Sequence, residues 1–159
     1  MKDPRERQGG VDADPLPEAA TVPRNNLAYA HQSAWRLEEA IPLYERTLTD
    51  RERVLGPDHP TVAVALYRLA TAQLALGDAS AAVGGFGRAA AIDEVAYGHD
   101  HPEVVTDLER LATAQQGVHD TAGVVASLRR ALEIRLETAG PNTAGVTELR
   151  RRPKNLLAH

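Results

Sequence analysis

The stretch that decides the fold is LGPDHP at residues 55–60, which returns as YGHDHP at 97–102 and, in weaker form, as AGPNTA at 139–144. Both intervals between the stretches are 42 residues long. A glycine can end a helix in the left-handed region, an Asp or Asn can cap the next helix, and a proline is tolerated in that helix's first turn. Each stretch therefore predicts a turn that joins two helices.

The same 42-residue interval relates the segments between these turns. Positions that align in this way are Leu27, Leu69 and Leu111; Ala28, Ala70 and Ala112; Ala40, Ala82 and Val124; Tyr44, Phe86 and Leu128; and Thr47, Ala89 and Ala131. The sequence therefore predicts three units, at residues 19–60, 61–102 and 103–144.

Two helices are expected in each unit, because apolar residues recur at spacings of three and four. The expected splits lie near residues 34–36, 77–78 and 119–120. Gly77 is a natural C-terminal residue for the helix before it, and Asp78 and Asp120 are plausible caps for the helix that follows.

Composition supports an all-α fold. Hydrophobic residues make up 43% of the 159-residue chain but aromatic residues only 4%. A core built from Ala, Leu and Val suits close packing of helices better than a β-sandwich. Cysteine is absent, which excludes disulfides, thiolate chemistry and cysteine-based zinc sites and is compatible with a reducing compartment.

Charge and hydropathy indicate a cytoplasmic protein that binds neither nucleic acid nor membrane. The net charge is −4, with acidic and basic residues interspersed rather than gathered in a basic surface. No apolar run approaches the ~20 residues of a membrane span, and the N-terminus lacks an apolar signal segment. Residues 1–18 are rich in Pro, Gly and charge, and we expect them to form a disordered leader.

Four motifs follow one another in the first unit: Asn25-Asn26-Leu27-Ala28, Glu38-Glu39-Ala40, Leu43-Tyr44-Glu45-Arg46 and Gly56-Pro57-Asp58-His59-Pro60. This order resembles the kinesin light chain-like subclass of the tetratricopeptide repeat, whose usual unit is ~34 residues. The resemblance covers about residues 20–144. It implies an all-α fold, a right-handed superhelix (α-solenoid) of three helix-turn-helix repeats.

The array is expected to end soon after the third unit. We expect a short polar capping helix at residues 145–152, followed by a tail at 153–159, so that the repeat domain covers 19–152. About three repeats are the minimum for a stable stack, because one helix pair does not bury its own apolar stripe.

The resemblance also implies a concave groove, lined by the first helix of each unit, that binds extended or helical peptides. Carried over by position, the groove residues are Asn25, Asn26, Tyr29, Gln32, Tyr67, Arg68, Thr71, Glu109, Arg110, Thr113 and Gln116. Any one of them could equally be a solvated residue of an amphipathic helix. Arg68 and Arg110 stand out, because they share one repeat position and Arg captures carboxylates in bidentate fashion.

Departures from the family pattern put particular ligands in doubt. The asparagine pair of the first unit is replaced by Tyr67-Arg68 and Glu109-Arg110 in the next two. The Lys and Asn arrangement with which some tetratricopeptide domains clamp a chaperone's C-terminal carboxylate is missing as well. A chaperone is therefore not the expected partner.

Three glycines, Gly84, Gly85 and Gly87, fall inside the second helix of the second unit. On one interpretation they only weaken that helix, by roughly 0.5–1 kcal/mol each relative to Ala. On the other, their missing side chains let the next unit's helix approach closely. Replacing Gly84 and Gly85 with Ala should raise the melting temperature in the first case and lower it in the second.

Patterns that resemble catalytic, cofactor or metal sites are better explained by the repeat. GFGRAA at 85–90 matches a loose dinucleotide fingerprint but lacks the preceding strand. His59 and His101 belong to the turn consensus, and no serine lies in a nucleophile elbow. We expect no enzyme activity, no cofactor and no bound metal.

The leading hypothesis is a non-catalytic interaction module that presents its groove to a peptide segment of a protein partner. The alternative is an assembly element whose ends pack on further repeats, on a signalling domain or on a second copy as a homodimer. The sequence leaves the partner's identity open.

Overall fold

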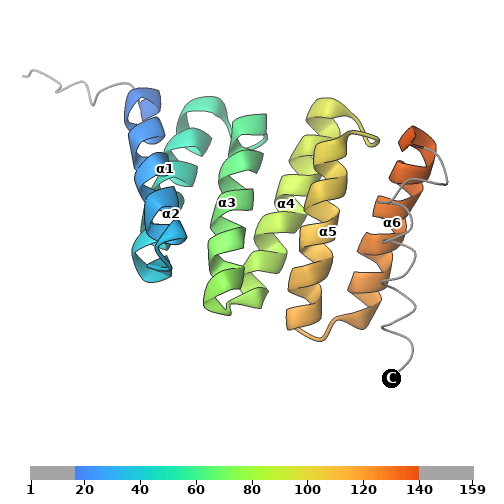
Figure 1. Ribbon diagram of the computed structural model, residues 1–159. Coiled ribbons are helices and arrows are strands. Elements are labelled where there is room, and N and C mark those ends of the chain that lie inside the picture. The colour runs from blue at the N-terminus through green and yellow to red at the C-terminus, as the bar shows by residue number, and fades with distance from the viewer. Residues whose placement is uncertain (1–16, 140–159) are drawn as a thin grey trace, which may run out of the picture.

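The computed structural model describes residues 17–139, and every regular element within them is an α-helix. The helices are α1 (Pro17–Ser33), α2 (Leu37–Leu55), α3 (Pro60–Leu76), α4 (Ala79–Tyr97), α5 (Pro102–Gly117) and α6 (Thr121–Ala139). Each helix packs on the next one in the chain, and together they form a row (Figure 1). The all-α solenoid is thus confirmed.

The helical region begins slightly earlier in the chain than expected. α1 begins at Pro17, so the helical region starts inside the segment expected to be a leader at 1–18. Proline suits the first position of a helix, because its missing N–H would be unpaired there in any case. The expected capping helix at 145–152, the tail at 153–159 and the third turn at 139–144 lie outside the described part of the chain or at its very edge.

The turns between units differ from expectation in their cap. His59 and His101, rather than the preceding aspartates, are the N-cap residues of α3 and α5. Their Nδ1 atoms accept hydrogen bonds from the backbone N–H groups of Thr61, at 3.2 Å, and Glu103, at 3.3 Å. The reason is the proline that follows, which forces the residue before it into the extended conformation that an N-cap requires.

Glycine ends the helix before each of these turns. Gly56 and Gly98 have φ of +89° and +99°, as a helix-ending glycine should, but their ψ values of 158° and 156° lie outside the left-handed region that was expected. That part of conformational space is accessible essentially only to glycine.

The turns within units follow the expected chemistry more closely. Gly77 has the left-handed conformation, with φ of +97°, and Asp78 accepts a hydrogen bond from the N–H of Ala81. Asp120 caps α6 by accepting from the N–H of Gly123, at 2.9 Å. His119 occupies the repeat position of Gly77 and is held at a positive φ of 60°, so the turn geometry persists where glycine does not.

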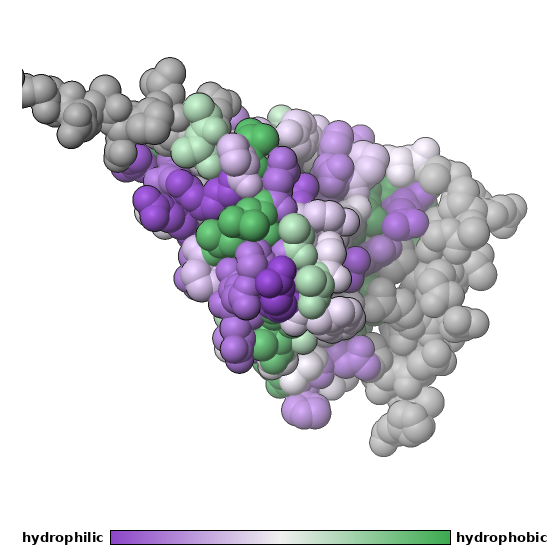
Figure 2. All heavy atoms as spheres, turned by 60° about the vertical axis from the view of Figure 1, so that its left-hand side comes forward, coloured by the Kyte–Doolittle hydropathy of each residue, from purple (hydrophilic) through white to green (hydrophobic). Residues whose placement is uncertain are grey.

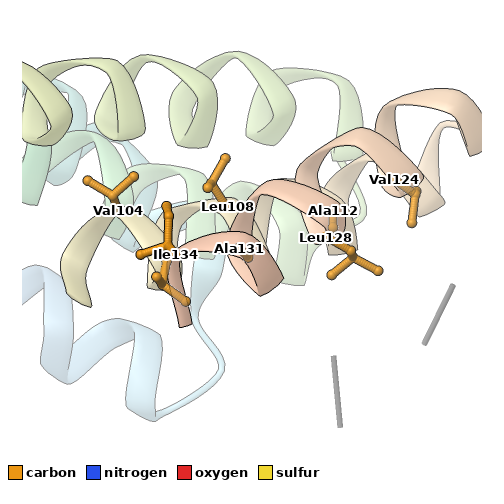
Figure 3. Packing of buried hydrophobic residues seen from close by; sticks show 8 residues of the cluster. Val104, Leu108, Ala112, Val124, Leu128, Ala131 and Ile134 are labelled. Atoms are coloured by element: carbon orange, nitrogen blue, oxygen red, sulfur yellow. The ribbon is translucent and has the colours of Figure 1, made fainter. Parts of the chain in front are cut away.

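One large side chain from the second helix of each pair fills the centre of the core. Tyr44, Phe86 and Leu128 share one repeat position and are 1%, 0% and 1% exposed. Alanines on the first helices let the backbones approach these side chains. In the α5–α6 pair the cluster joins Val104, Leu108 and Ala112 to Val124, Leu128, Ala131 and Ile134 (Figure 3).

Ion pairs join the second helices of neighbouring units in the same register. Arg88 of α4 pairs with Glu52 of α2, and Arg130 of α6 pairs with Glu94 of α4. The two glutamates and the two arginines are each 42 residues apart. The repeat therefore extends from the core to the polar contacts that link one unit with the next.

The three glycines of α4 have different surroundings. A Cβ at Gly85 would lie 2.7 Å from the Cβ of Ala70 in α3. Apart from the backbone of α4 itself, no atom of the described residues lies within 4 Å of a Cβ at Gly84 or Gly87. Close packing is therefore the reason for one glycine only, and the helix that approaches it is the first helix of the same unit rather than the next unit's helix.

These surroundings predict opposite effects for two neighbouring substitutions. Gly85→Ala should lower the free energy of unfolding by about 1 kcal/mol or more, because the backbones of α3 and α4 must separate. Gly84→Ala, its matched control, should raise the free energy by about 0.5–1 kcal/mol through reduced chain entropy. Urea unfolding followed by circular dichroism measures both, and a shift of the same sign in the two variants would contradict this explanation.

Candidate binding groove

The first helices of the three units, α1, α3 and α5, share a face of the array that contains a pocket of about 330 Å³. Its lining residues are Tyr29 and Gln32 of α1; Ala63, Val64, Tyr67, Arg68 and Thr71 of α3; Asp93 of α4; and Glu103 and Asp107 of α5. Helices from all three units thus contribute to one hollow.

Some of the groove residues expected from the sequence meet in this pocket. They are Tyr29, Gln32, Tyr67, Arg68 and Thr71. The others are not part of its lining: Asn25, Asn26, Glu109, Arg110, Thr113 and Gln116. The expected set therefore divides into a part that surrounds the pocket and a part that lies along the rest of the first helices.

A polar chain crosses the α1 side of the pocket. The hydroxyl of Tyr44 donates to Gln32 Oε1 at 2.7 Å, and the Arg68 guanidinium lies beside the same phenol. Burial raises the pKa of Tyr44 above its ordinary value, and the positive charge of Arg68 opposes that shift. Arg68 forms no ion pair with another residue of the described chain, so its charge remains available to a ligand.

The second tyrosine of the lining is held from two sides. Arg110 Nε donates to the Tyr67 hydroxyl at 3.1 Å, which links α5 to α3. The Tyr67 ring meets the buried Phe86 edge-on, with centroids 5.4 Å apart. Arg110 therefore orients a pocket residue, although it does not itself line the pocket.

The remaining expected residues lie in other surroundings. Glu109 accepts a hydrogen bond from Arg135 of α6 at 2.8 Å, and the Thr113 hydroxyl donates to the Glu109 carbonyl within α5. Asn26 and Gln116 are exposed. Asn25 is half-buried, and its Oδ1 has no hydrogen-bond partner among the described residues.

The α5 side of the pocket carries a feature that the sequence reasoning missed. Asp93 and Asp107 are 7% and 3% exposed, and both line the pocket together with Glu103. Their two carboxyl groups lie within hydrogen-bond reach of each other. Oδ2 of Asp107 is buried and has no hydrogen-bond partner in the described chain.

Burial and mutual repulsion change the protonation of this pair. Burial, with the negative charge of Asp93 and then that of Glu103, raises the pKa of Asp107 to about 8. Burial also raises the pKa of Asp93 above its ordinary range. Two carboxyl groups this close do not both ionise readily, so at neutral pH they share a proton.

The repeat register contained a signal for this pair. Asp107 occupies the position of Ala65, which is 1% exposed in the preceding unit, so an acid stands where the pattern places a buried apolar residue. Asp93 occupies the position of Arg51 and Arg135, so the charge at that position is reversed. Comparing the units for departures, as well as for matches, would have found both.

The histidines and the glycine-rich motif that could suggest a metal or cofactor site have structural roles. His59 and His101 cap helices, and the segment 85–90 lies within α4. In the described part of the chain, no group of three or more His, Cys, Asp or Glu side chains is placed to hold a metal ion. Across residues 17–139, no helix has the length and apolar character needed to cross a membrane.

Comparisons with known proteins agree with the fold. Residues 18–94 match the sequence model of the tetratricopeptide repeat. No curated protein matches the chain.

Three solved structures illustrate the similarity. A Podosopora anserina protein, described as a kinesin light chain with nearly identical TPR-like repeats, is 21% identical with a TM-score of 0.73, over 87% of this chain and 65% of that one. BtubC (BKLC) from P. vanneervenii is 19% identical with a TM-score of 0.78, over 88% of this chain and 56% of that one. The Sgt2 TPR domain from Aspergillus fumigatus is 18% identical with a TM-score of 0.62, over 87% of this chain and 79% of that one. The chain thus spans about two thirds or less of the length of the first two.

The raised pKa of Asp107 predicts that the stability of the protein falls with pH. In the folded state Asp107 keeps its proton up to about pH 8, whereas an unfolded Asp loses its proton at pH ~3.9. The stability that the held proton contributes is therefore fully present below pH ~3.9 and is lost as the pH rises toward 8. Asp107→Asn, which keeps the shape and a hydrogen-bond donor, should remove this loss.

The variant should therefore gain stability relative to the wild type, by up to ~1.4 kcal/mol per pH unit between pH 5 and 8. Urea unfolding across that range measures the difference, and Asp58→Asn, at an exposed acid in a turn, is the control. A constant difference between Asp107→Asn and the wild type would show that no proton is held by the pair.

Proposed function

We propose that the chain, which matches the tetratricopeptide-repeat model over residues 18–94 and shares the fold of kinesin light chain-like repeat proteins, binds a peptide segment of a partner protein in the groove of its first helices. Repeats of this family serve as protein-interaction scaffolds without catalytic chemistry of their own. The finer proposal is that the pocket bordered by α1, α3 and α5 is where the partner's segment binds.

The observation that carries this proposal is the combination of chemistries at one hollow. The pocket offers two tyrosine rings, a small apolar surface from Ala63 and Val64, and the guanidinium of Arg68. Aromatic and arginine side chains contribute most to binding energy at protein interfaces. A guanidinium without an ion-pair partner can take a carboxylate of the peptide in bidentate fashion.

The proposed module acts in the cytoplasm, a location with which the absence of cysteine is compatible. Its ligand is a protein segment rather than nucleic acid or a lipid surface, in keeping with the mixed charges of the chain and its net charge of −4.

A second candidate is an assembly element, and an exposed apolar residue of α1, the first helix of the array, favours it. Leu27 is 51% exposed, although Leu69 at the same repeat position is 8% exposed. Apolar side chains gather among polar ones on the side of the array where α1 and α2 lie (Figure 2). A further helix pair or a second copy of the chain could cover this surface, and sedimentation that gave only a monomer would count against the second copy.

Peptides selected from a random nonamer library against the full chain test the groove proposal. Arg68→Ala and Tyr29→Ala should each weaken the selected peptides by about tenfold, a loss of ~1.4 kcal/mol. Arg129→Ala removes an exposed arginine of α6 outside the pocket and should leave the affinity unchanged. Fluorescence polarisation gives the dissociation constants. Equal affinity in all three variants, or a library that yields no binder, would refute the proposal.

A further inference from the structure

The acidic end of the pocket is the strongest unexplained feature of the molecule. Buried carboxyl groups are expensive, because removal from water disfavours their charged form. Asp93 and Asp107 nevertheless stand side by side. Asp93 occupies a repeat position at which the other two units carry Arg, and Asp107 occupies a position at which the preceding unit carries a buried Ala. Neither is ion-paired with a basic residue of the described chain.

We propose that this end of the pocket is a receptor for a lysine or arginine side chain of the partner peptide. The proposal rests on the proposed function, since it names the chemistry of the segment that binds in the same groove. The cation would be received by the carboxyl groups of Asp93, Asp107 and Glu103, which line this end of the pocket. Oδ2 of Asp107 has no hydrogen-bond partner among the described residues, so the protein itself leaves this buried acid unsatisfied.

The rest of the lining suits the stem of such a side chain. Lysine and arginine carry three or four methylene groups that pack along apolar surface while the charged head stays among polar groups. Ala63 and Val64 of α3 provide that surface beside the acids. The ring of Tyr67 lines the same hollow and can attract a cation through its face.

The position of Arg68 sets a direction for the bound segment. Its guanidinium lies beside Tyr44 and forms no ion pair with Asp93, Asp107 or Glu103 in the described chain. The pocket is therefore bipolar, with positive charge toward α1 and acidic groups toward α5. A partner's cationic side chain is attracted to the α5 side and repelled from the α1 side, which fixes its placement.

Binding of a cation should release a proton from the pair. The groups that face Asp107 are Asp93 of α4, Glu103 of its own helix and, across the pocket, Arg68; His101 lies near Asp93. On the α6 side, Arg135 is already engaged with Glu109. A ligand cation favours the ionised form of both aspartates, so affinity should rise with pH toward the raised pKa of Asp107.

Four pools of capped nonapeptides test the inference on the full chain. The central residue is fixed as Arg, Lys, norleucine or Glu, and the other positions are mixed. At pH 8 the Arg and Lys pools should bind at least about tenfold more tightly than the norleucine pool, and at pH 6 this preference should shrink. Asp107→Asn and Glu103→Gln should each reduce the preference at pH 8, whereas Asp58→Asn, at an exposed turn residue, should leave it intact.

The outcomes separate this inference from the function on which it rests. If all four pools bind alike and Arg68→Ala weakens every pool, the groove binds peptides and the cation receptor is refuted. A preference for Glu or norleucine, or a cationic preference that both pocket variants leave unchanged, also refutes it. If no pool binds, the groove function itself fails and the receptor with it.

Discussion

The fold depends on one large side chain in the second helix of each pair, which fills the space against the first helices. Tyr44, Phe86 and Leu128 meet this requirement at 42-residue intervals and are almost fully buried. One helix pair leaves an apolar stripe uncovered, so each pair needs a neighbour, and stacking buries a continuous core. The first helices are thereby placed on a common face, where their remaining side chains form the pocket.

The acid pair is the point at which the molecule departs from its own repeat. Asp107 stands where Ala65 is buried in the preceding unit, and its burial raises the pKa to about 8. An apolar residue there would pack without this electrostatic cost. Natural proteins tolerate such costs mainly at functional sites, and here the acids border the same pocket as the tyrosines and Arg68.

Local chemistry explains which features could be predicted from the sequence. Helix ends followed from Gly and Pro, because those residues restrict the backbone wherever they occur. The cap was wrongly expected at the aspartate, although the proline after His59 already determined which residue takes the extended conformation. Gly85 and the Asp93–Asp107 pair depend on contacts between helices, which a pattern within one helix does not contain. The groove residues were expected by analogy, and the pocket gathers only part of them.

We propose that a partner binds to the face formed by the first helices. Amide NMR of the full chain, titrated with a peptide that it binds, tests this most directly, because every helix reports separately. We expect the shift changes to concentrate on the pocket-lining parts of α1, α3 and α5, around Tyr67, Arg68 and Asp107. Changes confined to α2, α4 and α6, with the pocket amides unmoved, would contradict it.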